Sequence, residues 1–204
     1  MERETRTLEI ELRVVRTEAG VPMIRGHAAV FNQLSDDLGG FREQIVPGAF
    51  ATAIASDDVR ALWNHNPDFI LGRNLSKTLR LSEDVRGLAI EIDPPDSQTV
   101  RDLVLMPMER GDVTQMSFAF SLRPNGEDWA KDDNGQWVRT LKNLRLFDVS
   151  PVTYPAYPQT DVAVAQRSLG QTIEQMAKAI ESIESAHRGQ FMDILQRRQQ
   201  LAAL

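Results

Sequence analysis

Short runs in which apolar and polar residues alternate recur through residues 1–165 and constrain the fold most strongly. The run from Leu8 to Val14 alternates apolar with charged residues, which is typical of a strand that buries one face. A turn at Glu18-Ala19-Gly20 and a second run at Met23–Phe31 predict a hairpin. Further strands are expected at Val59–Trp63, Thr78–Leu81, Leu88–Ile92, Thr114–Leu122, Trp137–Leu141 and Leu144–Val149. This pattern predicts a mainly β protein with helices, of the α+β class, built as an antiparallel β-barrel or sandwich.

Two other segments have helical periodicity. Asp96–Arg110 places its apolar residues at helical spacing, with Asp96 or Ser97 as N-cap and Gly111 as the stop. After residue 165, apolar residues recur every three or four positions without a proline, which predicts one amphipathic helix of roughly 30 residues. We therefore expect a β-rich domain at 1–165 and a C-terminal amphipathic helix at 166–204 that binds a partner or a second copy of itself.

Charge and residue usage exclude several classes of protein. The chain has 23 Lys and Arg against 29 Asp and Glu, for a net charge of −6, and it has no basic run, so nucleic acid is not an expected partner. The absence of cysteine excludes disulfides, thiolate metal sites and a cysteine nucleophile. Neither a signal-like start nor a stretch of about 18 apolar residues occurs, so neither an export signal nor a membrane span is expected.

The predicted strand Thr114–Leu122 offers a candidate nucleophile. Its apolar residues at even positions would face the core, which places Ser117 and Ala119 on the opposite, displayed face. The small side chain of Ala119 leaves room for another backbone to approach the Ser117 hydroxyl. An ordinary exposed serine explains the position as well, because serine attacks a carbonyl only where a base accepts its proton.

The sequence has 3 histidines that could supply this base. His187 lies on the predicted C-terminal helix and fits a surface or helix-seam residue, and His27 fits a half-buried strand residue. His65 follows an apolar run, and Pro67 would keep Asn66 extended and cap the strand. A histidine at a strand end is well placed to line a cleft, although a purely structural role explains His65 equally well.

Asp148 is the best candidate for an acid that orients the base. It follows Leu144 and Leu146 at period two, which carries its carboxylate into apolar surroundings before the strand breaks at Pro151. A buried carboxylate requires a hydrogen-bond partner, and an imidazole N–H would serve while the other ring nitrogen acts as a base. An aspartate that closes a local turn explains the position equally well. The weaker alternatives are Asp161, Glu91 and Asp93.

Other kinds of site have less support. A metal site would require His27 and His65 to converge with an acid, and neither belongs to an H-E-x-x-H pattern; a metal-dependent hydrolase on these residues is the lowest-ranked alternative. Gly39-Gly40 is too short for a phosphate-binding loop and does not precede a predicted helix. Nothing marks two of the acidic residues as a catalytic carboxylate pair.

Four motifs in order carry a resemblance to a known family. They are Val46-Pro47-Gly48-Ala49-Phe50, Asn64-His65-Asn66 followed by Leu71-Gly72, Met116-Ser117-Phe118-Ala119-Phe120, and Asp148-Val149-Ser150-Pro151-Val152-Thr153-Tyr154-Pro155-Ala156. Each motif alone is weak, but their order and spacing make the combination specific. From about Leu8 to Val164 the sequence resembles the tailed-phage prohead proteases, whose fold is similar to that of the herpesvirus assembly proteases.

The resemblance implies a serine endopeptidase that cuts the scaffold, or the scaffolding segment of the major capsid protein, during head maturation. It implies catalytic roles for His65, Ser117 and Asp148, a location inside the procapsid in the host cytoplasm, a homo-oligomer, and self-cleavage as a further reaction. We expect no cofactor and no metal. Glycine often stands in this family where the chain has Ala119, and glutamate often stands where it has Asp148.

Two questions remain open at this stage. A non-catalytic capsid-assembly protein, with a β-rich body and a helix that binds scaffold or itself, is the alternative to a protease. The group that would stabilise the oxyanion is either a backbone N–H near Ser117 or a side chain such as Arg139 or Arg145.

Overall fold

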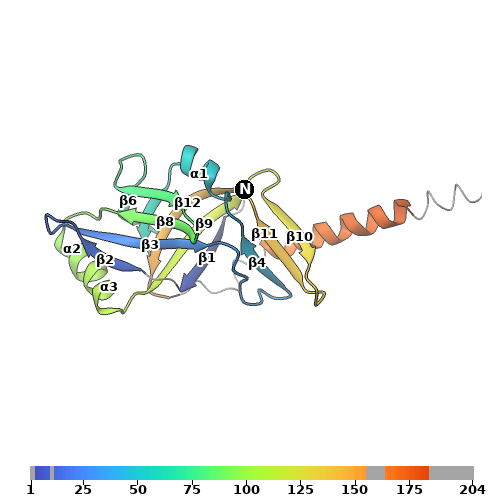
Figure 1. Ribbon diagram of the computed structural model, residues 1–204, viewed down its shortest axis with the longest axis horizontal. Helices are drawn as coiled ribbons and strands as arrows, with labels where there is room; N and C mark the ends of the chain where they lie inside the picture. The colour runs from blue at the N-terminus through green and yellow to red at the C-terminus, as the bar shows by residue number, and fades with distance from the viewer. Residues whose placement is uncertain (1–2, 10–11, 155–163, 184–204) are drawn as a thin grey trace, which may run out of the picture. The chain divides into compact units, whose positions relative to one another are not determined.

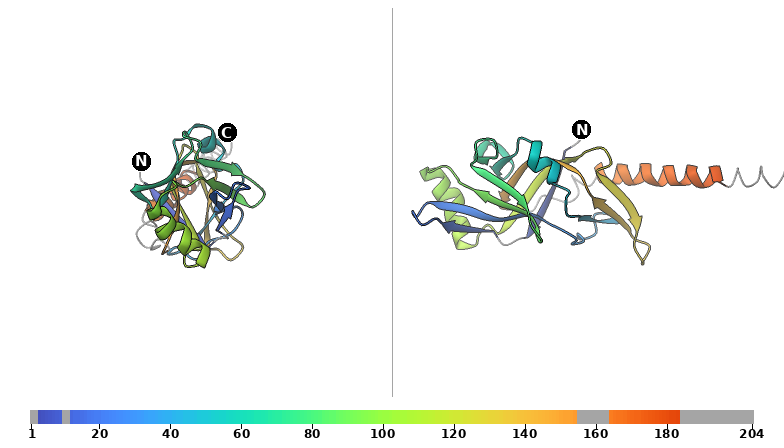
Figure 2. Two further views of the ribbon diagram at one scale, coloured as in Figure 1. Left: turned by 90° about the vertical axis from the view of Figure 1, so that its left-hand side faces the viewer. Right: turned by 45° about the horizontal axis from the view of Figure 1, so that its top comes forward.

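The β-rich part of the chain is built from sheets that share one apolar core (Figures 1 and 2). The computed structural model describes residues 3–9, 12–154 and 164–183. The chain divides into two compact units, Met1–Val162 and Ala163–Leu204. Within the described residues, the strands of the first unit form a five-stranded, a four-stranded and a three-stranded sheet.

The five-stranded sheet has the order β1-β9-β12-β5-β6. Ser117 and Asp148 lie on its strands, and His65 lies in a turn between two of them. Its strands are β1 (Glu4–Glu9), β9 (Gln115–Leu122), β12 (Leu144–Val152), β5 (Arg60–Trp63) and β6 (Asn66–Arg73). The four-stranded sheet consists of β2 (Arg13–Arg16), β3 (Pro22–Val30), β8 (Gly87–Ile92) and β7 (Leu79–Glu83). The three-stranded sheet consists of β10 (Glu127–Lys131), β11 (Trp137–Leu141) and β4 (Phe41–Ile45).

The predicted fold class, mainly β with helices, is confirmed. The prediction of an antiparallel barrel is corrected in two respects. The sheets are open rather than closed on themselves. They are also not purely antiparallel, because β12 pairs with β5 and β11 pairs with β4 in parallel.

The single strand predicted from Leu8 to Val14 is wrong. The chain there forms β1, which pairs with β9, and then β2, which pairs with β3 in a different sheet. Both sheets pack on one core, so the apolar alternation continues although the chain changes sheets. The hairpin prediction is confirmed for β2 and β3, whose turn contains Gly20 at a φ of 77°.

The helix predicted at Asp96–Arg110 is confirmed, with a widened middle turn. It consists of α2 (Gln98–Val100), the π-helical η1 (Arg101–Leu105) and α3 (Met106–Arg110). Ser97 is the N-cap, since its Oγ accepts a hydrogen bond from the Val100 N–H at 3.2 Å. Gly111 ends the helix at a left-handed φ of 81°. A further short helix, α1 (Ala51–Ser56), precedes β5.

The second unit contains a helix over residues 164–183. Ile173, Met176, Ile180 and Ile183 all lie exposed on it. The rest of the predicted helix, including His187, and the proline-containing segment 155–163 lie outside the described residues. No helix in the described part of the chain is both long enough and apolar enough to cross a membrane.

Candidate active site

Three side chains from distant parts of the sequence meet on the five-stranded sheet. The His65 Nε2 atom lies 2.6 Å from the Ser117 Oγ atom, and His65 Nδ1 lies 2.5 Å from Asp148 Oδ1. An ionised carboxylate only accepts hydrogen bonds, so Nδ1 carries the proton and donates it to Asp148. Nε2 then accepts from the Ser117 hydroxyl. In this tautomer the imidazole is ready to act as a base for Ser117.

An irregularity in β12 brings Asp148 to the same side of the sheet as Ser117. Leu146 lies opposite Phe120 on β9, but Asp148 lies opposite Ala119, so the register shifts and Phe147 has no partner. Such a bulge reverses the phase of the alternation and re-aims the side chains that follow. Strict alternation from Leu146 would have placed Asp148 on the core face, away from Ser117. The prediction that Asp148 is buried and bonded to an imidazole is confirmed, but strict alternation does not explain how it reaches His65.

The Asp148 carboxylate is buried and has several donors. Its side chain is 2% exposed. The Ser150 hydroxyl donates to Asp148 Oδ1 at 2.8 Å, and the Arg3 guanidinium donates to Asp148 Oδ2. Sequence reasoning missed both partners. The contact of Ser150 with Asp148 could have been predicted, because residues two apart in a strand share a face. Nothing in the sequence pointed from Arg3 to Asp148.

His65 sits in a tight turn rather than at the end of a strand. Asn64 and His65 have φ values of 53° and 57° and form the two-residue turn between β5 and β6. Left-handed φ at both positions is typical of a type I′ hairpin, and asparagine tolerates it best among non-glycine residues. The predicted capping by Pro67 is wrong, because Pro67 lies inside β6, an edge strand where proline is tolerated.

Asn64 ties this turn to the end of β12. Its backbone N–H donates to the Pro151 carbonyl at 3.0 Å, and its Oδ1 accepts from the Thr153 N–H at 2.9 Å. The predicted strand break at Pro151 is also wrong, since β12 continues to Val152 and Pro151 lies opposite Met116. This continuation gives Asn64 the partners that hold the His65 turn beside Asp148. Sequence reasoning also assigned no role to Asn64, which it quoted only as part of a motif.

Ser117 is buried, contrary to the prediction that it is displayed. The serine has 0% exposure, as has Ala119, because both faces of β9 are covered and not just the core face. In the sheet, Ser117 lies between Thr7 of β1 and Ser150 of β12, and these strands run side by side in Figures 1 and 2. The His65 side chain, in contrast, remains 21% exposed.

The strand β1 is anchored next to the site by a buried ion network. Arg139, with 0% exposure, binds Glu4 at 2.7 Å, Glu43 at 2.9 Å and Glu127 at 2.5 Å. Arg6 also binds Glu43. Burial would raise the pKa of Glu4, but the hydrogen bonds and charges of Arg139 and Arg6 outweigh it and lower that pKa. The network therefore holds ionised carboxylates in the interior and fixes β1 against its neighbours.

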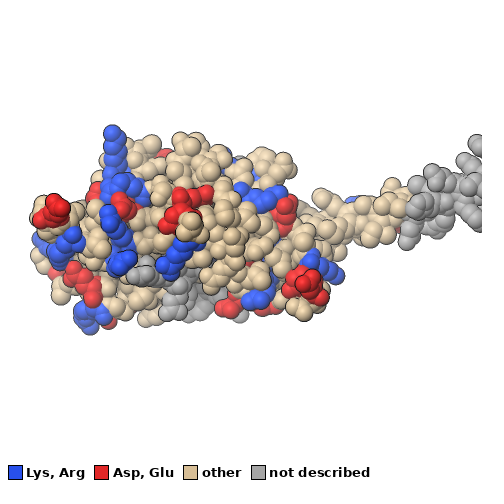
Figure 3. All heavy atoms as spheres, in the orientation of Figure 1, with Lys and Arg blue, Asp and Glu red and all other residues tan. Residues whose placement is uncertain are grey.

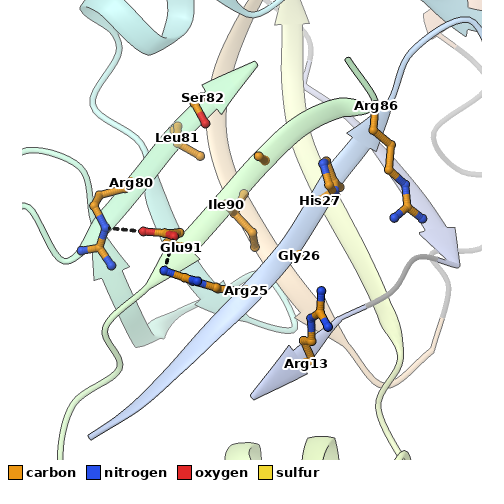
Figure 4. A pocket seen from close by; sticks show the side chains of 11 residues that line it. Arg13, Arg25, Gly26, His27, Arg80, Leu81, Ser82, Arg86, Ile90 and Glu91 are labelled. Atoms are coloured by element: carbon orange, nitrogen blue, oxygen red, sulfur yellow. Dashed lines mark hydrogen bonds and ion pairs between the residues drawn. The ribbon is translucent and has the colours of Figure 1, made fainter. Parts of the chain in front are cut away.

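A surface pocket lies apart from these residues, on the four-stranded sheet (Figure 4). It is lined by four arginines, among other residues: Arg13, Arg25, Arg80 and Arg86. Glu91, which also lines it, binds Arg25 at 2.7 Å and Arg80 at 2.9 Å. Figure 3 shows basic and acidic side chains next to one another over this face. The pocket is therefore a hollow on the outer face of the four-stranded sheet, where Arg25 and Arg80 pair with Glu91.

The two histidines of the proposed metal-dependent alternative do not share a site. His27 lies in β3 of the four-stranded sheet, and its Nε2 is 2.8 Å from Asp84 Oδ2, whereas His65 is bound to Ser117 and Asp148 on the five-stranded sheet. The hydrogen bond from His27 lowers the pKa of Asp84. Among the residues that the structure describes, no group of three His, Asp or Glu side chains is arranged to hold a metal ion.

Comparison with known proteins identifies the family. The chain matches the family model of the caudovirus prohead serine proteases over residues 8–175. No curated protein and no solved structure matches the chain. The matched range includes β9, β12 and the hairpin turn that carry the three hydrogen-bonded side chains, and it covers most of the 204 residues. The chain therefore belongs to the caudovirus prohead serine protease family.

Proposed function

We propose that the protein is a serine endopeptidase in which Ser117, His65 and Asp148 form the catalytic triad. The observation that carries this proposal is the hydrogen-bonded order Ser117 Oγ, His65 Nε2, His65 Nδ1 and Asp148 Oδ1. Ser117 Oγ attacks the carbonyl carbon while His65 Nε2 takes the hydroxyl proton. His65 then gives this proton to the leaving amine nitrogen as the peptide C–N bond breaks, and Asp148 stabilises the transient imidazolium.

The structure removes one of the two arginines considered above as oxyanion donors. Arg139 does not fit this role, because its guanidinium is bound to three buried glutamates. Arg145 lies on the Ser117 side of β12, opposite Ser121. A backbone N–H near Ser117 and the Arg145 side chain therefore stay as the two proposed donors.

Access to Ser117 requires a movement of the protein. A serine with 0% exposure offers a substrate carbonyl no path to its Oγ atom. We infer that one of the segments covering β9 shifts when substrate binds. The triad itself can stay in place during this shift, because the partly exposed His65 already has its two hydrogen bonds.

The proposed substrate is the scaffold or the scaffolding segment of the major capsid protein, cut inside the procapsid in the host cytoplasm. Membership of a prohead serine protease family supports this substrate class. Self-cleavage of the chain is part of the same proposal. The buried Ser117 and the exposed apolar residues of the helix also fit a non-catalytic assembly protein. The hydrogen-bonded Ser117, His65 and Asp148 side chains favour catalysis.

Replacement of the serine tests the proposal directly. We expect Ser117→Ala to abolish cleavage of co-expressed major capsid protein and labelling by a fluorophosphonate in assembled procapsids, since loss of a triad serine costs on the order of 10⁶ in rate. Ser121→Ala is the matched control, because Ser121 lies on the same face of β9 and is equally buried. Cleavage by the Ser117→Ala variant would overturn the serine assignment, and a wild type that neither cleaves nor takes up the probe would support the assembly protein.

The helix over residues 164–183 is the proposed docking element for scaffold or for a second copy of the chain. Its exposed Ile173, Met176, Ile180 and Ile183 are spaced by three or four residues, so they form an apolar stripe. We expect Ile180→Glu to weaken self-association measured by analytical ultracentrifugation, whereas Lys178→Ala leaves it unchanged. A wild type that stays monomeric at all concentrations would contradict the homo-oligomer.

A further inference from the structure

We propose that Arg3 is a positioning residue of the candidate active site, which fixes the orientation of the Asp148 carboxylate that holds His65. This inference rests on the proposed catalytic roles of Ser117, His65 and Asp148. Arg3 does not touch Ser117 or the reacting carbonyl in this scheme. It acts through Asp148, the one acid that both His65 and Arg3 contact.

The donors on Asp148 divide between its two oxygen atoms. Among the described residues, Oδ1 accepts from His65 Nδ1 and from the Ser150 hydroxyl, and Oδ2 accepts from the Arg3 guanidinium. The carboxylate is nearly inaccessible to water. Arg3 therefore supplies what solvent would otherwise supply, a donor and a countercharge on the oxygen atom that faces away from the imidazole.

Two independent contacts bring Arg3 to this place. The next residue, Glu4, is buried and bound by Arg139 at 2.7 and 3.0 Å, which fixes the register of β1. Arg3 also stacks on the ring of Phe147, with its Cζ 5.4 Å from the ring centroid. Phe147 is the bulge residue of β12. The same irregularity thus turns Asp148 toward His65 and supplies the surface on which Arg3 rests.

Arg3 is also the described cation that binds the Asp148 carboxylate directly. Two other arginines lie nearby but make other contacts. Arg145 stacks on Phe147, and Arg60, which lies opposite Asp148 in the register of β12 and β5, binds Asp58. Loss of Arg3 would therefore leave the buried carboxylate without its countercharge and free to turn away from His65.

The separate effects on kcat and KM in cleavage of the major capsid protein test the proposal. We expect Arg3→Gln to lower kcat by up to about 10²-fold with little change in KM, because a misplaced catalytic group slows the chemical step. Arg3→Lys, which keeps the charge, should restore most of kcat. Arg60→Gln is the matched control, because Arg60 lies opposite Asp148 in the register but binds Asp58 instead, and it should leave kcat unchanged.

A second readout separates positioning from a structural role. Urea unfolding of Arg3→Gln should stay close to that of the wild type, because the Arg3 side chain is 48% exposed and the buried pair of Glu4 and Arg139 holds β1. An unchanged kcat in both Arg3→Gln and a second neutral variant, Arg3→Met, would overturn the proposal. Failure of the triad itself would appear differently, as cleavage that survives Ser117→Ala.

Discussion

Ion pairs lie in two regions of this protein that differ in their exposure to solvent. Next to the active site, Arg139 and Glu4 have almost no exposed surface. On the four-stranded sheet, Arg80 and Glu91 have side chains 41% and 36% exposed. Breaking a buried pair leaves a charge without water or partner, whereas breaking an exposed pair returns both groups to solvent. We therefore expect the loss of the buried Arg139 to cost more stability than the loss of the exposed Arg80.

The strongest way to break this comparison is to remove the buried cation. We expect Arg139→Met to destabilise the fold by about 3–5 kcal/mol, because it leaves Glu4, Glu43 and Glu127 without their shared partner. Urea unfolding followed by circular dichroism measures the loss. A variant as stable as the wild type would show that these carboxylates reach water or take up protons at no cost.

The pH dependence of the same variant sharpens the test. In the wild type the pKa of Glu4 is lowered, so its contribution is present above the unfolded pKa near 4.5 and is lost as the pH falls through the folded value. Without Arg139 only Arg6 offsets the burial of Glu4, so the pKa of Glu4 rises and the variant loses less stability than the wild type as the pH falls. The difference between wild type and variant should therefore shrink with falling pH.

A smaller effect is expected at the turn that holds His65. Asn64→Ala removes the Oδ1 acceptor for the Thr153 N–H and places alanine at a left-handed φ. We expect kcat for capsid-protein cleavage to fall by up to about 10²-fold, since small misplacements of a catalytic group have effects of this size. Asn64→Asp keeps an acceptor oxygen and serves as control. An unchanged kcat in Asn64→Ala would mean that Ser117 and Asp148 alone hold His65 in place.

The smallest change in stability is expected for the exposed ion pairs of the four-stranded sheet. Arg80→Ala removes ion pairs with Glu91 and Asp93, and solvent-exposed pairs of this kind contribute about 0–1 kcal/mol. Thermal unfolding should change little, and cleavage of capsid protein should equal that of the wild type. A loss of cleavage with normal stability would instead mark the arginine-lined pocket as functional.

The sequence predicted local structure well and its irregularities poorly. Alternation located β9 and placed Ser117 opposite its apolar residues, as the register requires. It also predicted an exposed Ser117, because alternation separates two faces of a strand but does not say whether the second face is covered. For Asp148, a strict period of two points to the wrong side of the sheet, and no local signal announces the bulge at Phe147.

Contacts across long sequence separations account for the rest. Arg3 meets Asp148, and Asn64 meets Thr153, only because β1, β9, β12 and β5 lie side by side in the folded sheet. The family resemblance supplied the residues that local patterns left undecided, and it named His65, Ser117 and Asp148 together. It gave no role to Asn64 or Ser150, although both stand in the matching motifs, and Arg3 lies outside those motifs altogether.

The enclosed position of Ser117 has a consequence for the host cell. On the proposed function, a chain in this conformation offers bystander proteins no reactive hydroxyl. The movement that exposes Ser117 would then decide both when and where peptide bonds are cut.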